Sequence, residues 1–175
     1  SNVYIYIIMQ SKTFGEIHLI NSINVESVID ILKNKPELWN LDKTRQTLYE
    51  EHKETESIIL IFTNNTYPYE RKINKELIGV FKPFLNELIS ILNEHFKYSQ
   101  PVIVKLIFAK LKAGGKIKPH IDNGFILQVP NRIHIPIITN EDVIFTINKK
   151  QKQLKKGNIY NFNNTMEHSV INNSS

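Results

Sequence analysis

The chain has 175 residues, of which 41% are apolar and 22% are charged, and its formal net charge is +5. This length and composition predict a single soluble globular domain with a substantial core. The lack of cysteine excludes a disulfide framework and a thiolate metal site. No apolar run approaches the roughly 18 residues of a membrane span, and the apolar opening at residues 3–9 has no basic leader, so we expect a cytoplasmic protein.

Two helices and three strands are predicted in the first hundred residues. Apolar residues at three- and four-residue spacing indicate a helix over residues 25–33. A longer helix is predicted over residues 74–97, where Asn74 is a favourable N-cap and Pro83 is expected to bend the axis. Trp39 is expected in the core. Strands are predicted at residues 3–9, 16–20 and 57–63.

The second half of the chain is predicted to be mostly strand, at residues 102–111, 132–138, 143–147 and 158–162. The basic run at residues 149–156 is interpreted as a solvated hairpin, with a docking patch for an acidic partner as the alternative. Elsewhere lysine is interspersed with glutamate and aspartate, so the pI near 9.3 does not indicate nucleic-acid binding. The elements together predict a mainly β protein with flanking helices (α+β), a jelly roll of the cupin type.

Two histidines and one aspartate in the last third of the chain form a candidate metal site. His120 and Asp122 are two residues apart, so in an extended strand their side chains point to the same side. His168 would bring a second imidazole from a distant strand. Two histidines and one carboxylate, with other positions left open, are the ligand set of non-haem Fe(II) oxygenases. A histidine and an aspartate at this spacing also occur as an exposed polar strand face or a simple hydrogen-bonded pair.

The strand predicted at 132–138 has strict alternation, with isoleucine at 133, 135 and 137 and with Arg132, His134 and Pro136 on the other face. In an ordinary half-buried strand the polar face is solvated. In a small β-barrel that holds a ligand, the same face points inward, where Arg132 offers a planar fork of donors suited to a carboxylate. Both interpretations stay open on the alternation alone.

Three segments together resemble the aspartyl/asparaginyl β-hydroxylase family. They are GG-x-x-x-PH-x-D at residues 114–122, Arg-Ile-His at residues 132–134, and NN-x-x-x-HSV-x-N at residues 163–172. The resemblance covers roughly residues 100–175 and preserves the order and approximate spacing of the elements. It implies a double-stranded β-helix and a dioxygenase that uses Fe(II), the co-substrate 2-oxoglutarate and O₂.

The resemblance also implies roles for individual residues. His120, Asp122 and His168 would bind the iron, and Arg132 and His134 would contact the co-substrate close to the metal. With Fe(II) and 2-oxoglutarate bound, such a site activates O₂ to hydroxylate an unactivated C–H bond, while the protein orients and shields the reactants.

The chain departs from the family at two positions. Ala109 stands where the family usually has a serine that helps to hold the far carboxylate of 2-oxoglutarate. The family arginine that pairs with this carboxylate lies about ten residues beyond the second histidine, whereas this sequence ends at Ser175. We therefore expect a core over residues 99–175 that lacks its last strand, with residues 172–175 as a turn leading into it. Residues 1–98 would supply N-terminal strands and supporting helices to the same domain.

A segment before the core, residues 45–58, resembles less closely an R…H…T-x-SI pattern of smaller family members. By this resemblance Arg45 and His52 would line the mouth of the site and bind a substrate carboxylate. The alternative interpretation is that both are surface charges that precede a buried strand.

The leading hypothesis is an Fe(II)- and 2-oxoglutarate-dependent hydroxylase acting on an amino-acid residue of a peptide or on a small amino-acid-like molecule. One alternative is a cupin-like module that binds a metal or ligand without oxygenase turnover. Another is a metal-dependent isomerase or dioxygenase that does not consume 2-oxoglutarate.

Overall fold

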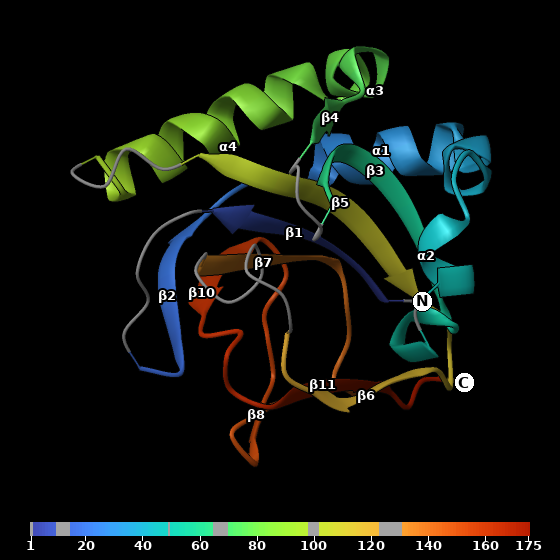
Figure 1. Ribbon diagram of the computed structural model, residues 1–175, viewed down its shortest axis with the longest axis vertical. Helices are drawn as coiled ribbons and strands as arrows, with labels where there is room; N and C mark the ends of the chain where they lie inside the picture. The colour runs from blue at the N-terminus through green and yellow to red at the C-terminus, as the bar shows by residue number, and fades with distance from the viewer. Residues whose placement is uncertain (1, 10–14, 49, 65–69, 98–101, 123–130) are drawn as a thin grey trace.

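The chain folds into three layers, two antiparallel β-sheets and a layer of helices, as seen in a computed structural model that describes residues 2–9, 15–48, 50–64, 70–97, 102–122 and 131–175. Helices cover one face of the larger sheet, and the smaller sheet packs against the other face (Figure 1). The architecture is mainly antiparallel β with a jelly-roll-like arrangement, as the sequence predicts.

The larger sheet has seven strands in the order β2-β10-β7-β1-β5-β3-β4. Its strands in chain order are β1 (Asn2–Met9), β2 (Ile17–Ser22), β3 (Thr55–Thr63), β4 (Arg71–Ile73), β5 (Ile103–Leu111), β7 (Asn131–Ile138) and β10 (Asn158–Phe162). The smaller sheet has the order β6-β11-β8-β9. Its strands are β6 (Lys116–His120), β8 (Val143–Ile147), β9 (Lys150–Lys152) and β11 (His168–Asn172).

The strand pairs of the second half of the chain are nested. β8 pairs with β9, β7 with β10 and β6 with β11, so each pair joins strands farther apart in the sequence, and the pairs alternate between the sheets. Such nesting folds a ribbon of antiparallel strands into a jelly roll. The next strand outward, β5, pairs with the N-terminal strand β1, which lies between β5 and β7 in the middle of the larger sheet. Strands from both halves of the chain therefore build one sheet.

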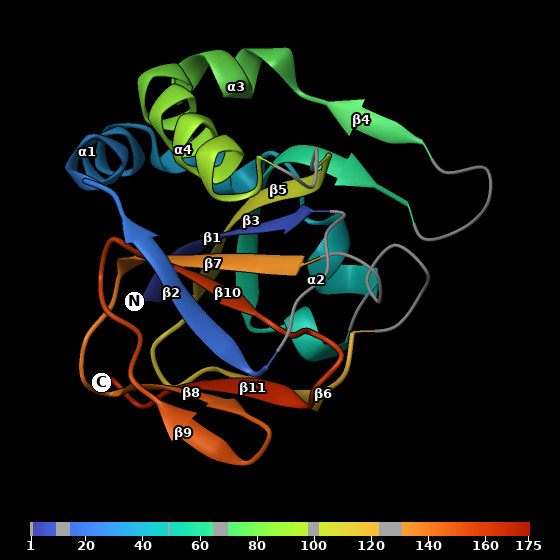
Figure 2. The ribbon, with the colours of Figure 1, turned by 90° about the vertical axis from the view of Figure 1, so that its left-hand side faces the viewer.

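Alternation along the strands of the larger sheet produces two apolar cores. On β1, Val3, Ile5 and Ile7 pack toward the helices, while Tyr4, Tyr6 and Ile8 belong to the cluster between the two sheets. The view from the side shows the two sheets facing one another (Figure 2). The inner cluster contains four aromatic residues among its aliphatic ones, Tyr4, Tyr6, Phe145 and Phe162, so aromatic rings line part of the space between the sheets.

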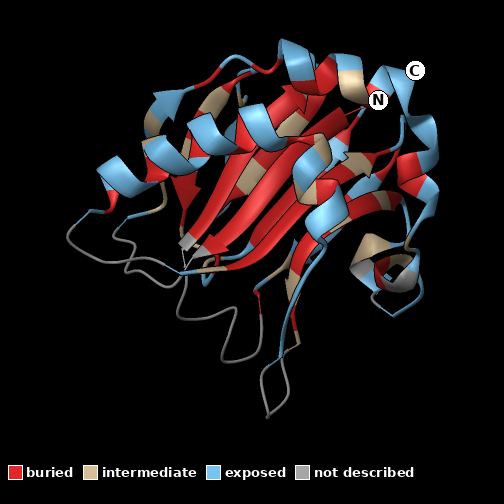
Figure 3. Cartoon of the chain, turned by 90° about the horizontal axis from the view of Figure 1, so that it is seen from above, coloured by how far each residue is buried: buried red, intermediate tan, exposed pale blue. Residues whose placement is uncertain are grey.

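The helical layer consists of α1 (Glu26–Asn34), α3 (Lys75–Val80) and α4 (Lys82–His95). Seen from above, these helices lie across the buried strands, with their exposed sides outward (Figure 3). Short helical segments, η1 (Pro36–Asn40), α2 (Thr44–Leu48) and η2 (Glu50–His52), connect α1 to β3. Trp39 on η1 is buried, as predicted. Within the described residues, no helix is both long enough and apolar enough to cross a membrane.

The single bent helix predicted over residues 74–97 is wrong, because the chain forms two helices instead. Asn74 caps α3 as predicted, and its side chain accepts a hydrogen bond from the Leu77 backbone N–H at 3.0 Å. Helix α3 ends at Val80, with Phe81 as its C-cap, and Pro83 occupies the first turn of α4. Proline has no N–H to donate and its ring clashes with the preceding turn, so it is favourable at a helix start and unfavourable inside one.

All seven predicted strands are present with boundaries within about two residues of the predictions. The short strands β4 and β9 were not predicted, and β6 and β11 were expected only as the strands that carry His120 and His168, without bounds. The basic run forms the expected exposed hairpin, in which Asn148 and Lys149 adopt positive φ between β8 and β9. The turn predicted at 172–175 is wrong at its start, because Asn172 ends β11 and its side chain donates to the backbone carbonyls of Leu111 and Lys112.

Candidate metal centre

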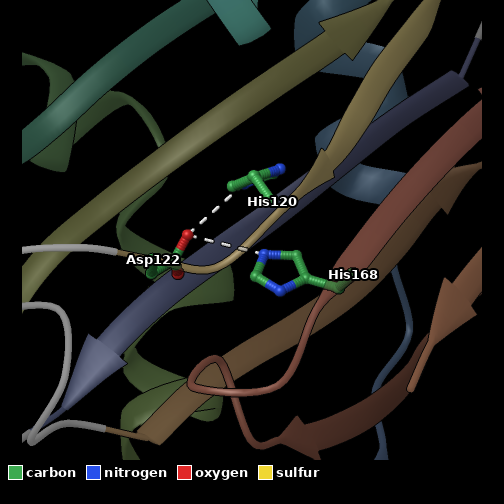
Figure 4. Close-up of side chains that lie close together, drawn as sticks. All are labelled: His120, Asp122 and His168. Carbon is green, nitrogen blue, oxygen red and sulfur yellow. Dashed lines mark ion pairs between the residues drawn. The ribbon is translucent and has the colours of Figure 1, made fainter.

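Two adjacent strands of the smaller sheet bring His120, Asp122 and His168 together. His120 ends β6 and lies directly opposite His168, the first residue of β11, in the antiparallel register. Opposed residues of this kind have neighbouring side chains, and the two imidazole centroids are 4.4 Å apart. Asp122 follows β6 and points back between the rings (Figure 4). One ligand atom from each residue lies within 4.8 Å of the others.

Each imidazole is oriented by a backbone carbonyl two residues before it. The Nδ1 atom of His120 lies 2.7 Å from the Lys118 carbonyl oxygen, and the Nδ1 atom of His168 lies 2.8 Å from that of Met166. Because a carbonyl oxygen only accepts, the proton of each neutral ring belongs on Nδ1. The lone pair of each Nε2 then faces the common space. The buried Nε2 of His168 has no hydrogen-bond partner among the described residues, which fits a metal ligand.

The two oxygens of Asp122 have different surroundings. Oδ1 lies 3.4 Å from Nε2 of His120 and 3.5 Å from Nε2 of His168. Oδ2 accepts hydrogen bonds from Arg132 Nη1 at 2.8 Å and from Asn164 Nδ2 at 3.1 Å. Burial alone would raise the pKa of the Asp122 carboxyl, but Arg132 and the two histidines together hold that pKa well below its usual range. Asp122 therefore presents a charged oxygen to the histidines while its other oxygen is held in place.

The carboxylate oxygen lies at a distance from each imidazole nitrogen that suits a shared divalent cation. Ligands bound at about 2.0–2.2 Å from one ion lie about 3 to 3.5 Å apart, which matches the two Nε2–Oδ1 separations. The two histidines lie at paired positions of β6 and β11 and Asp122 lies two residues beyond β6, so the three would cover one side of an ion and leave the opposite side for other ligands. Nitrogen and carboxylate donors of this kind suit iron, manganese and zinc.

Metal affinity is expected to fall on acidification. Burial acts to lower the pKa of His120, but the Asp122 carboxylate and the Lys118 carbonyl outweigh it, so this pKa is raised above its usual value. A bound cation must displace this proton at lower pH, which costs about tenfold in affinity per pH unit for each proton displaced. Titration calorimetry with Mn²⁺ between pH 8 and pH 5.5 would measure the change. A dissociation constant that stays flat over this range would contradict His120 as a ligand.

Strand β7 places Arg132 and His134 in the space between the sheets. Ile133, Ile135 and Ile137 pack under the helices, so the polar face of the strand points inward and the solvated-face interpretation is wrong. His134 stacks on Tyr4 with centroids 4.6 Å apart and lines the same pocket as His120 and His168. Burial, reinforced by the charge of Arg132, lowers the pKa of His134 to about 3, so its ring is neutral near pH 7.

Arg45 and His52 contact one another, and of the two only His52 lines the pocket. Arg45 is buried, with Nη1 donating to Ser57 Oγ at 2.8 Å and Nη2 lying 2.9 Å from His52 Nε2. The surface-charge interpretation is therefore wrong for Arg45. His52 lines the pocket together with His120 and Arg132. Burial and the adjacent Arg45 guanidinium lower the pKa of His52 far below its usual value, so His52 is neutral.

Three further residues of this region were not identified from the sequence. Asn164 bonds Asp122 through its side chain, and its backbone carbonyl accepts from the Asp122 N–H at 3.2 Å. The ring of Tyr6 has the guanidinium carbons of Arg45 and Arg132 at 5.1 and 4.3 Å from its centroid. Lys105 is buried on the inner face of β5. Asn164 belongs to the NN-x-x-x-HSV-x-N segment, from which its place in the site could have been predicted. The sequence around Tyr6 and around Lys105 contains no such motif.

The chain is a mainly β protein with a jelly-roll-like fold, in which two histidines and one carboxylate could hold a metal ion. The family model of aspartyl/asparaginyl β-hydroxylases matches residues 81–175, and the chain belongs to this family. A search of curated proteins found no match. The matched range begins in the helical layer at Phe81 and contains every residue of the candidate metal centre.

Proposed function

We propose that this protein is an Fe(II)- and 2-oxoglutarate-dependent hydroxylase. The observation that carries the proposal is the convergence of His120 Nε2, His168 Nε2 and Asp122 Oδ1 on one space inside a chain of the β-hydroxylase family. Its substrate is an amino-acid residue of a peptide or a small amino-acid-like molecule. When bound, the iron and co-substrate supply O₂ activation, in which 2-oxoglutarate, O₂ and a C–H bond give succinate, CO₂ and an alcohol.

The protein's own residues would bind and orient these reactants. His120, Asp122 and His168 would hold the iron. Arg132 fixes Asp122 through Nη1, and its Nε, which has no partner among the described residues, remains available for a co-substrate oxygen. His134, neutral and packed on Tyr4, would offer a second polar contact next to Arg132. Aromatic side chains around this face, including Phe145 and Phe162, would limit access of water.

The test is co-substrate turnover. Purified protein incubated in air with Fe(II), ascorbate and 2-oxoglutarate is expected to produce succinate above the level of a protein-free control, because the proposed oxidation of 2-oxoglutarate releases succinate. A library of peptides and amino acids that stimulates this rate would then identify the substrate class. Tight Fe(II) binding with no succinate under any of these conditions would contradict the proposal and favour the cupin-like binding module.

A further inference from the structure

The N-terminal strand occupies a place that the nested strand order would give to another strand. β8 pairs with β9, β7 with β10 and β6 with β11, so the next partner outward, that of β5, would be a strand that follows β11. β1 fills this place instead, because it pairs antiparallel with both β5 and β7 (Figure 1). The side chains on its inner face therefore belong to the wall of the space that contains the metal centre.

Tyr6 lies on this inner face, beside the strand that carries Arg132 and His134. Tyr6 is opposite His134 in the register of β1 and β7, and Arg132 is two residues earlier on β7, so Tyr6 and Arg132 are diagonal neighbours. Such neighbours are within reach of aromatic and long side chains. The guanidinium carbon of Arg132 lies over the Tyr6 ring, 4.3 Å from its centroid. Both residues are buried, so this is a cation–π contact away from water.

The hydrogen bonds of Arg132 leave part of its guanidinium unfixed. Nη1 donates to Asp122 Oδ2 at 2.8 Å, whereas the buried Nε has no hydrogen-bond partner among the described residues. A group held at one end can swing about that end, so the neighbouring rings decide where the rest of it lies. Phe162, opposite Arg132 on β10, has its ring centroid 5.5 Å from the guanidinium carbon. Of the two rings, Tyr6 makes the closer contact.

The Tyr6 ring is itself held in place. The guanidinium carbon of Arg45 lies 5.1 Å from its centroid. Arg45 is fixed in turn, because Nη1 donates to Ser57 Oγ at 2.8 Å and Nη2 lies 2.9 Å from His52 Nε2. The backbone around Tyr6 pairs with β5 on one side and with β7 on the other. Tyr6 is therefore a rigid support for the Arg132 guanidinium.

This series of contacts ends at the metal-facing oxygen of Asp122. Arg132 donates to Oδ2, and Oδ1 of the same carboxylate lies 3.4 and 3.5 Å from Nε2 of His120 and of His168. Asn164 also donates to Oδ2, at 3.1 Å. Two donors on one oxygen set the direction in which the other oxygen points. Groups that orient a metal ligand in this way contribute strongly to metal affinity.

We propose that Tyr6 is a positioning residue of the metal centre, which holds the Arg132 guanidinium so that Asp122 presents Oδ1 to the metal. The inference rests on the metal centre of the proposed function and adds to it a support from the N-terminal strand. The guanidinium lies over the ring, so the ring has this role and the hydroxyl group does not.

Three variants separate the ring of Tyr6 from its hydroxyl group and from other rings. Tyr6→Leu removes the ring and Tyr6→Phe keeps it. Phe62→Leu is the matched control, because it removes a ring that lies under a different cation, with Lys105 Nζ 4.7 Å from the centroid. Titration calorimetry with Mn²⁺ measures metal affinity without turnover. Tyr6→Leu is expected to weaken Mn²⁺ binding by about 5- to 30-fold, the equivalent of a buried cation–π contact. Tyr6→Phe and Phe62→Leu should stay within about twofold of the wild type.

A double-variant cycle tests whether Tyr6 acts through Arg132. In a protein that already carries Arg132→Met, Tyr6→Leu should change Mn²⁺ affinity by less than about twofold. A general packing role would instead weaken binding by the same factor in both backgrounds. Thermal melting without metal identifies the folded variants, which alone are compared. If Tyr6→Leu does not fold, Tyr6→Met replaces it, because methionine fills the space without a π face. If Arg132→Met does not fold, the three single variants decide.

The outcomes separate the role of Tyr6 from the metal centre itself. Wild-type Mn²⁺ affinity in folded Tyr6→Leu, or equal losses in Tyr6→Leu and Phe62→Leu, would overturn the role of Tyr6 and leave the centre intact. A loss in Tyr6→Phe as large as that in Tyr6→Leu would also overturn it, because the hydroxyl group would then be the part that matters. Failure of the wild type to bind Mn²⁺ would overturn the metal centre, and with it the proposed function.

Discussion

A His168→Ala variant is expected to lose divalent metal binding and, with it, succinate formation. His168 is almost completely buried and its Nε2 has no hydrogen-bond partner among the described residues, so the substitution removes one of the three donor atoms of the centre. Removing a residue that merely supports a metal ligand typically weakens affinity by about 10- to 100-fold, and loss of a ligand itself should exceed that range. Calorimetry with Mn²⁺ and a succinate assay with Fe(II) would measure the two effects.

His95→Ala is the matched control for this variant, because His95 is exposed on α4, outside the space between the sheets. It should bind metal and produce succinate as the wild type does. Thermal melting of all three proteins without metal would show whether His168→Ala retains its fold. A folded His168→Ala protein with wild-type metal affinity would remove His168 from the metal centre.

Among single substitutions in the site, Arg132→Met is expected to cause the largest loss in the free energy of unfolding. Arg132 is the cation paired with the buried Asp122 carboxylate, and their contact distance is 2.8 Å. Removing one partner of a buried ion pair leaves the other charge uncompensated and typically costs about 3–5 kcal/mol in the free energy of unfolding. Urea denaturation at pH 7 without metal would measure the loss.

The double variant Asp122→Asn/Arg132→Met tests the cause of this loss. It removes both charges, so it should be more stable than Arg132→Met alone. The difference in unfolding free energy between the wild type and Arg132→Met should also become smaller as the pH falls. In the wild type the lowered pKa of Asp122 contributes stability above the unfolded pKa, and this contribution is lost as the pH falls. Without Arg132, burial favours the protonated carboxyl, which stabilises the folded variant at low pH. A double variant no more stable than Arg132→Met would contradict this account.

Local sequence patterns predicted the long strands well and the short ones poorly. Residues 131–138 alternate so regularly that the two faces of β7 could be assigned residue by residue. The segments that became β4 and β9 are short and exposed along their whole length, so they have no apolar face to detect. β6 is only five residues long and contains Pro119, and unlike β7 it has no run of alternating apolar residues to outweigh the proline.

Residues of the candidate site that belong to a sequence motif could be predicted. Residues that reach the site only through tertiary packing could not. The His120, Asp122 and His168 set could be proposed because all three belong to recognisable segments. The alternation of β7 could not say whether Arg132 meets solvent or the second sheet, since that depends on what covers the strand. Arg45 precedes Arg132 by 87 residues, and they share a neighbour only because β1 places Tyr6 between them. No local signal carries that information.

The central position of β1 has a consequence for how the chain folds as it is synthesised. Val3 is opposite Lys110 on one side and Ile138 on the other, so β1 pairs only with strands that are synthesised about a hundred residues after it. Closing such long loops is slow, and until then the apolar run from Val3 to Ile8 has no sheet to join. An unpaired strand of this composition is an aggregation hazard. During synthesis, the apolar side chains of β1 therefore stay without their sheet partners until β5 and β7 have been made.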